Sequence, residues 1–180
     1  MEVSVIIPTY NRPDDLKEAL NSILKQTVLP GEIIIVDDGD VRETARLLEE
    51  MGGQIEDKGV CLKHIPKTKT RGINISRNIG IKSSKGDVVL FLDDDVVLEE
   101  NYVEQILKVY ENNPDAVGVQ GCIANYVRPR IKNIFNRLFF LVHSEANTNR
   151  LLPSIQNVYA MPLDRIITVS YTHLTLPTKA

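Results

Sequence analysis

Three adjacent aspartates, Asp93, Asp94 and Asp95, directly follow the expected strand 87–92, whose residues 88–92 are all apolar. Aspartate has a reference pKa of about 3.9, so at neutral pH the three carboxylates are charged and repel one another unless a cation offsets them. Oxygen ligands of this kind suit a hard divalent ion such as Mg²⁺ or Mn²⁺. If the backbone stays extended, Asp93 and Asp95 share one face and Asp94 points the other way. A solvated acidic turn that caps a helix is the competing interpretation.

Basic residues and glycines precede the aspartates in the sequence. Arg71 and Arg77 could offset a diphosphate, because arginine binds phosphate through two parallel hydrogen bonds. Gly72 and Gly80 permit close backbone approach. The run 67–71 is also explained as a solvated basic loop, so these residues by themselves indicate a phosphate site only weakly.

The expected secondary structure brings the unusual residues to one edge of a sheet. Buried strands are expected over 3–8, 33–39, 60–65, 87–92 and 116–123. Helices are expected from residue 11 onward and over 41–51, 74–84 and 100–112. This alternation predicts a mostly parallel sheet with helices on both faces, in which ligands bind outside the carboxyl ends of the strands. The polar stretches 9–12, 37–40 and 93–95 fall at those ends, although Asp37 and Asp38 are also explained as turn formers.

Composition indicates a soluble globular chain. Its 180 residues suit one domain, with 43% hydrophobic and 25% charged residues. The net charge of −3 gives no electrostatic case for nucleic acid as a partner. Cys61 and Cys122 are expected to be buried and reduced. No apolar run has the length of about 18–20 residues that spans a bilayer, and no basic segment precedes the first strand, so a cytoplasmic location is expected.

Three separated stretches resemble the family 2 glycosyltransferases of the GT-A fold. They are "VSVIIPTYNRPDDLKEALNSILKQT", "IIIVDDGD" and "RGINISRNIGIKSSKGDVVLFLDDDVVLEENYVEQIL". The resemblance covers about residues 2–123 and is specific, because the three motifs occur in order. It implies an α/β GT-A fold, a Rossmann-like three-layer α/β/α sandwich with a mostly parallel central sheet. It also implies a UDP- or GDP-sugar donor, a divalent metal (Mg²⁺ or Mn²⁺) and sugar transfer with inversion.

The resemblance also assigns residues to the donor site. The nucleoside pocket would be lined by Pro8, Thr9, Tyr10 and Asn11. Asp38 would meet the base, and Asp37 and Gly39 would shape its turn. The stretch that closes over the nucleotide would contain Arg71, Gly72, Arg77 and Asn78. In the Asp-x-Asp region, Asp93 would face the ribose or the metal, Asp94 would lie beside the nucleotide, and Asp95 would bind the metal and face the diphosphate. Asp40 departs from the serine that usually follows this family's "DDG", and its added charge is expected to weaken or retune the turn.

The part of the chain after residue 123 does not match the family's acceptor half. Residues 1–123 are expected to bind the donor, 124–168 to begin an incomplete acceptor half that includes an amphipathic helix over 131–143, and 169–180 to be a non-native tail. The stretch "VSYTHLTLPT" resembles a translated sequencing adapter. The acids after Asp115 are Glu145 and Asp164, and neither lies in a context that matches the family's general base. The catalytic base is therefore expected to be missing from this chain.

Two other functions were weighed against this one. A sugar-1-phosphate nucleotidylyltransferase would have a glycine-rich signature after the first strand, whereas "PTYNRPDD" contains no glycine. A non-catalytic nucleotide-binding module would keep the donor residues without the base. The acceptor is not identified, because family members act on glycans, lipid carriers and proteins. The resemblance also leaves open a peripheral position at the cytoplasmic membrane for a longer parent protein.

Overall fold

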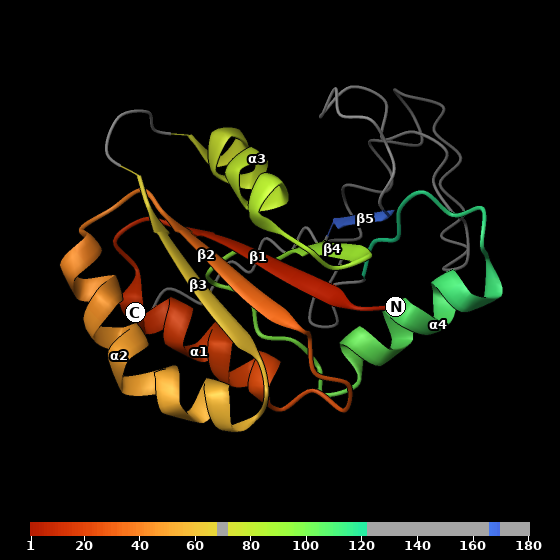
Figure 1. Cartoon of the computed structure of the whole chain (residues 1–180), viewed down its shortest axis with the longest axis horizontal. Helices are drawn as coiled ribbons and strands as arrows, with labels where there is room; N and C mark the ends of the chain where they lie inside the picture. The colour runs from red at the N-terminus through yellow and green to blue at the C-terminus, as the bar shows by residue number, and fades with distance from the viewer. Residues whose placement is uncertain (68–71, 122–165, 170–180) are drawn as a thin grey trace, which may run out of the picture.

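The computed structural model describes residues 1–67, 72–121 and 166–169 (Figure 1). The strands are β1 (Val3–Thr9), β2 (Glu32–Asp37), β3 (Cys61–Pro66), β4 (Val88–Phe91) and β5 (Ile166–Val169). The helices are α1 (Pro13–Leu24), α2 (Val41–Asp57), α3 (Ile73–Ser83) and α4 (Tyr102–Asn112). The strands form one sheet in the order β3-β2-β1-β4-β5, and every neighbouring pair is parallel.

Helices cover both faces of the sheet. In Figure 1, α1, α2 and α4 lie on one side of the strands and α3 on the other. The alternation of side chains along β1 explains this: Val5 and Ile7 belong to the larger apolar cluster with α1, α2 and α4, whereas Ile6 belongs to the smaller cluster with Ile81 of α3. The expected three-layer α/β/α sandwich is therefore confirmed.

The order of the strands opens a crevice beside β1. The chain runs outward from β1 through β2 to β3, and then returns to place β4 on the opposite side of β1. The Ile6 carbonyl accepts a hydrogen bond from Leu92 N at 3.0 Å, so Pro8, two residues further on, faces the same side. Pairing between β1 and β4 ends at Ile6–Phe91, and proline has no N–H with which to extend it. The two strands therefore separate at their carboxyl ends, where ligands bind in such sheets.

A buried carboxylate holds the opposite edge of the sheet together. Glu32 of β2 accepts hydrogen bonds from Ser4 Oγ of β1 at 2.6 Å, from Lys63 Nζ of β3 and from the backbone N–H of Lys85 before β4. Burial alone would raise the pKa of Glu32, but the hydrogen bonds from Lys63 and Ser4 outweigh it and lower the pKa below its usual value. One carboxylate thus links the starts of four strands and fixes the register that the crevice requires.

Several expectations from the sequence were wrong. Helix α2 continues to Asp57, past the expected end at residue 51. Residues 116–121 form no strand, and the strand beside β4 is instead β5, which the sequence did not predict. Cys61 is exposed, since it begins the edge strand β3.

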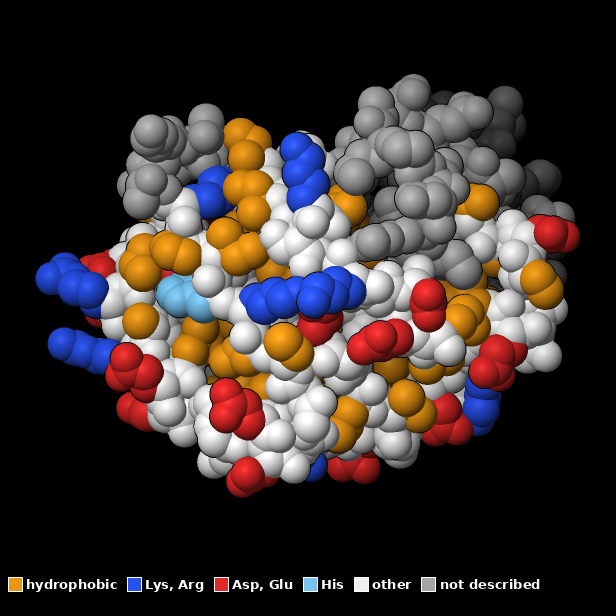
Figure 2. Space-filling view, in the orientation of Figure 1, with side chains coloured by type: hydrophobic (Ala, Val, Ile, Leu, Met, Phe, Trp, Pro, Cys, Tyr) orange, Lys and Arg blue, Asp and Glu red, His pale blue; other side chains and the backbone are white. Residues whose placement is uncertain are grey.

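Some of the expected features lie outside the described residues. They are Arg71, Cys122, the helix 131–143, Glu145, Asp164 and residues 170–180. In the described ranges, no helix combines the length and apolar character that crossing a bilayer requires. On the face shown in Figure 2, acidic and basic side chains are interspersed, in keeping with the net charge of −3.

Two glycine-to-alanine substitutions in helices should change stability in opposite directions. A Cβ at Gly80 would lie 2.3 Å from Ile6 Cγ2, so Gly80→Ala should push α3 away from β1 and cost about 1–3 kcal/mol. Gly53 is the matched control, since no atom lies within 4 Å of a Cβ built there. Gly53→Ala should stabilise the protein by about 0.5–1 kcal/mol through helix propensity. Urea unfolding measures both values, and equal effects would contradict the packing of α3 on β1.

Candidate functional site

The three aspartates lie where β4 ends, beside the end of β1. Thr9 Oγ1 donates a hydrogen bond to Asp94 Oδ2 at 2.9 Å, joining the two strand ends across the crevice. Because β4 ends at Phe91 and a turn follows at Asp94, the alternation expected for an extended backbone does not apply. Asp94 is buried with 7% of its surface exposed.

Two arginines neutralise the aspartates from opposite sides. Arg77 Nη2 lies 2.9 Å from Asp93 Oδ1, and its guanidinium stacks over Phe91 with the ring centre 5.7 Å away. Arg12 Nη1 lies 3.3 Å from Asp94 Oδ1 and 3.2 Å from Asp95 Oδ2. Burial raises the pKa of Asp94 above its usual value, although the Thr9 hydroxyl and the charge of Arg12 favour the ionised form. The repulsion expected from the sequence is thus offset by cations that the protein itself supplies.

Asp38, at the end of β2, is held by the start of α3. Its Oδ1 lies 2.6 Å from Lys67 Nζ, and its Oδ2 accepts hydrogen bonds from Gly72 N at 3.2 Å and Ser76 Oγ at 3.0 Å. Burial would raise the pKa of Asp38, but the contacts with Lys67, Gly72 and Ser76 prevail and lower it. The carboxylate is therefore a fixed, negatively charged acceptor. Gly72 has φ 136°, a conformation that favours glycine, and this places its N–H toward Asp38.

The turn after β2 is held by side chains from two loops. Fully buried Asp37 accepts a hydrogen bond from Gly39 N at 2.8 Å, and Asn11 Oδ1 accepts one from Asp40 N at 2.6 Å. Asn11 adopts φ 53°, and a Cβ at Gly39 would lie 2.2 Å from its Oδ1. A larger residue than glycine would therefore displace Asn11. Asp40 caps α2 by accepting a hydrogen bond from Arg42 N at 3.0 Å, so the acid that departs from the family pattern stabilises this helix start.

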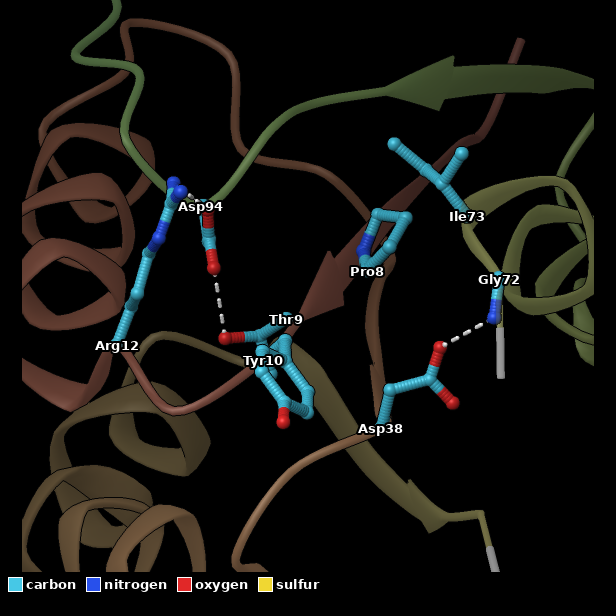
Figure 3. A pocket seen from close by; sticks show the side chains of 8 residues that line it. All are labelled: Pro8, Thr9, Tyr10, Arg12, Asp38, Gly72, Ile73 and Asp94. Carbon is cyan, nitrogen blue, oxygen red and sulfur yellow. Dashed lines mark hydrogen bonds and ion pairs between the residues drawn. The ribbon is translucent and has the colours of Figure 1, made fainter. Parts of the chain in front are cut away.

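These groups surround a pocket of about 370 Å³. Its lining residues are Pro8, Thr9, Tyr10, Arg12, Asp38, Gly72, Ile73 and Asp94. Figure 3 shows Arg12 and Asp94 on one side of the pocket, Asp38 and Gly72 on the other, and Pro8 and Tyr10 between them. The volume is in the range of small-molecule sites, with apolar walls and acids at both ends.

Six of the residues expected at the donor site line this pocket: Pro8, Thr9, Tyr10, Asp38, Gly72 and Asp94. Asp37, Asn11 and Gly39 do not line the pocket but hold the turn after β2. Arg77 is buried under Asp93, and Asn78 is half-buried beside it on α3. Arg71 lies outside the described residues.

Several residues that shape the site have no role predicted from the sequence. Lys67 was interpreted as part of a solvated loop, yet its side chain is only 7% exposed beside Asp38. Ser76 and Ile73 carried no signal beyond their place near Gly72. Arg12 belongs to the polar stretch 9–12, and this position at the end of the first strand was the feature that could have indicated its place in the site.

The donor atoms at the aspartates fit a hard divalent ion. Asp93 and Asp95 keep 21% and 29% of their side-chain surface exposed, so neither carboxylate is sealed from solvent. Two carboxylates suffice where substrate phosphates complete the shell of Mg²⁺. Within residues 1–67, 72–121 and 166–169, no group of three or more His, Cys, Asp or Glu side chains is arranged to hold a metal by itself.

Comparison with known proteins identifies the family. The model of the family described as "Glycosyl transferase family 2" matches residues 4–160, and this chain belongs to that family. The glucosyl-dolichyl phosphate glucuronosyltransferase of Haloferax volcanii is 39% identical over 125 residues, which cover 68% of this chain and 38% of that protein.

Solved structures confirm the GT-A architecture. S. aureus TarS 1–349 in complex with UDP matches with a TM-score of 0.59 and 27% identity, over 72% of this chain and 38% of that one. The mannosyltransferase PcManGT of Pyrobaculum calidifontis, in complex with GDP-Man and Mn²⁺, matches with a TM-score of 0.57 and 24% identity over 76% of this chain and 38% of that one, and shows the fold alone. The chain thus spans about 38% of the length of these relatives.

Removing the cation beside Asp38 should destabilise the protein in a pH-dependent way. Lys67→Met leaves a largely buried carboxylate without its ion pair, which should cost about 1–3 kcal/mol at pH 7. Because the folded pKa of Asp38 is lowered, its stabilising contribution is present above its ordinary pKa of 3.8 and is lost as the pH falls through the folded value. The difference between Lys67→Met and wild type should therefore shrink in acid.

Chemical unfolding at neutral and acidic pH measures this difference. Lys17→Met is the control, because it breaks the exposed ion pair with Glu50 and should cost less than about 1 kcal/mol. A Lys67→Met effect that stays constant as the pH falls from 7 to well below 3.8 would show that Lys67 does not act through the charge of Asp38.

Proposed function

We propose that this chain is the donor-binding part of an inverting, metal-dependent glycosyltransferase that uses a UDP- or GDP-sugar. One observation carries the proposal: the 2.9 Å contact between Thr9 and Asp94 brings the aspartates of β4 beside the end of β1, at the edge of the pocket. Such switch points of parallel sheets are where nucleotides bind. Membership of glycosyl transferase family 2 supports the class of reaction.

The nucleoside would occupy the pocket between Pro8, Tyr10 and Asp38. Tyr10 is 47% exposed, so its ring is available for stacking against a base. Asp38 is held in its ionised form and can only accept hydrogen bonds, which favours a base edge with a ring N–H, as in uracil or guanine. The structure of TarS with UDP lends support from a relative of the same fold.

The diphosphate would lie toward the aspartates. Asp93 and Asp95 would hold the divalent ion, and Asp94, fixed by Thr9, would keep the turn in place. When bound, the ion would offset the negative charge that develops on the leaving nucleoside diphosphate. Arg77, already placed beside Asp93, would keep that carboxylate oriented.

Transfer needs a second half of the site. The oxygen of an acceptor hydroxyl would form the new bond to the anomeric carbon while the bond to the diphosphate breaks on the opposite face. The hydroxyl proton would pass to a carboxylate base. We propose that this base comes from the acceptor half of a longer protein, consistent with the 38% of the Haloferax relative that this chain covers.

Calorimetry tests the donor-binding proposal directly. The chain is titrated with UDP, GDP and their sugar conjugates, each with and without Mn²⁺. The proposal expects binding of a uridine or guanosine diphosphate that strengthens with Mn²⁺. Absence of binding, or binding unaffected by the metal, would overturn the metal-dependent donor site.

Asp95→Asn should weaken Mn²⁺-dependent binding of UDP or GDP, about tenfold or more, because the amide removes the charge that attracts the ion. Glu99→Gln is the matched control, since Glu99 is an exposed acid four residues further on. It should leave the affinity unchanged. Equal losses in the two variants would show that general negative charge, and not a specific ligand, accounts for metal binding.

A further inference from the structure

Arg12 occupies an unusual position for an arginine. It is the N-cap residue of α1, where its carbonyl accepts a hydrogen bond from Leu16 N at 3.0 Å, but its side chain makes no capping hydrogen bond. N-cap positions favour Ser, Thr, Asp and Asn, and a positive charge there opposes the helix dipole. Arg12 therefore does little for α1, and residues that break such a local rule are expected at functional sites.

The side chain of Arg12 is directed at the aspartates instead. A single nitrogen, Nη1, contacts carboxylate oxygens of both Asp94 and Asp95, at 3.3 and 3.2 Å. Figure 3 shows the guanidinium of Arg12 beside Asp94 at the margin of the pocket that both residues line. The arginine thus holds a positive charge at the carboxylates that would receive a divalent ion.

The two arginines at this site differ in how firmly they are held. The side chain of Arg77 is 6% exposed and lies over the ring of Phe91, so it is held in place by its surroundings. The side chain of Arg12 is 53% exposed. Its carboxylate partners are only 9% and 29% exposed, but solvent reaches the guanidinium and weakens these ion pairs relative to fully buried ones. Of the two guanidinium groups that contact these aspartates in the described ranges, Arg12 is the one that can leave.

We propose that Arg12 is a tethered cation that occupies the carboxylates of Asp94 and Asp95 in the ligand-free protein and moves to the diphosphate when the metal and nucleotide bind. An ion held by Asp95 competes with the guanidinium for that carboxylate, because two positive charges so close together repel each other, and the exposed guanidinium is the one displaced. A displaced guanidinium at the pocket margin has the fork of N–H donors that binds phosphate oxygens. Arg12 is then a positioning residue that lets the empty site fold without a metal. The inference rests on the proposed donor-binding function.

The test compares metal binding with nucleotide binding in the full chain. Mn²⁺ alone is titrated into wild type and Arg12→Gln, with bound Mn²⁺ followed by electron paramagnetic resonance. Arg12→Gln should bind Mn²⁺ about two- to fivefold more tightly, because no tethered cation competes. In saturating Mn²⁺, calorimetry should show UDP or GDP binding about tenfold more weakly, because a phosphate contact is lost.

Two further variants separate charge from structure. Arg12→Lys keeps the charge but not the fork, so its Mn²⁺ affinity should stay near that of wild type and its nucleotide affinity should fall between wild type and Arg12→Gln. Lys17→Gln removes the same charge from the exposed side of α1 and should change neither affinity. A merely structural role for Arg12 would weaken both affinities together and lower the melting temperature.

The outcomes distinguish this inference from the proposed function. Equal Mn²⁺ affinity in wild type and Arg12→Gln, with metal-dependent nucleotide binding intact, would overturn the role of Arg12 alone. Nucleotide binding without any dependence on Mn²⁺ would overturn both. Mn²⁺ binding that is stronger in Arg12→Gln while nucleotide binding is weaker would support the tethered cation, since loss of structure cannot produce opposite changes.

Discussion

Electrostatic repulsion among Asp93, Asp94 and Asp95 governs the whole carboxyl edge of this sheet. Three carboxylates at the end of a buried strand are tolerable only when cations and hydrogen-bond donors face them. Arg77 approaches from α3, Arg12 from the start of α1, and the Thr9 hydroxyl from β1. Each of these groups comes from a different element. The contacts that balance the charge therefore also hold the ends of β1 and β4 and two helices together around one crevice.

Helix α3 connects the aspartates after β4 with the acid at the end of β2. Its first turns carry Ser76, which donates to Asp38 after β2, and Arg77, which pairs with Asp93 after β4. The helix can reach both strand ends because Gly80 lets it lie directly on Ile6 of β1. Helix α3 therefore contributes both to the apolar layer and to the charge balance of the site. A change in how α3 packs would also move the partners of Asp38 and Asp93.

The pocket is already charged and shaped in the absence of a ligand. Asp38 is kept ionised by Lys67, and the aspartates after β4 are covered by arginines of which one is buried and one exposed. A donor nucleotide would thus meet a fixed acceptor at one end and an exchangeable cation at the other. Such an arrangement lowers the cost of binding, because few side chains have to be ordered when the ligand arrives.

The sequence determined the elements and the position of the site, because the period of apolar residues sets strand and helix, and the carboxyl ends of parallel strands meet at one edge. It placed Thr9, Asp38 and Asp94 at the ends of strands, and in the structure all three line the pocket. Only the tertiary structure decided which cation faces which acid. Lys67 pairs with Asp38, and Arg12 pairs with Asp94 and Asp95. The pairing of β5 with β4 was likewise decided by the tertiary structure. Those contacts join residues far apart in the chain, and the local pattern of apolar and polar residues cannot predict which distant side chains will meet.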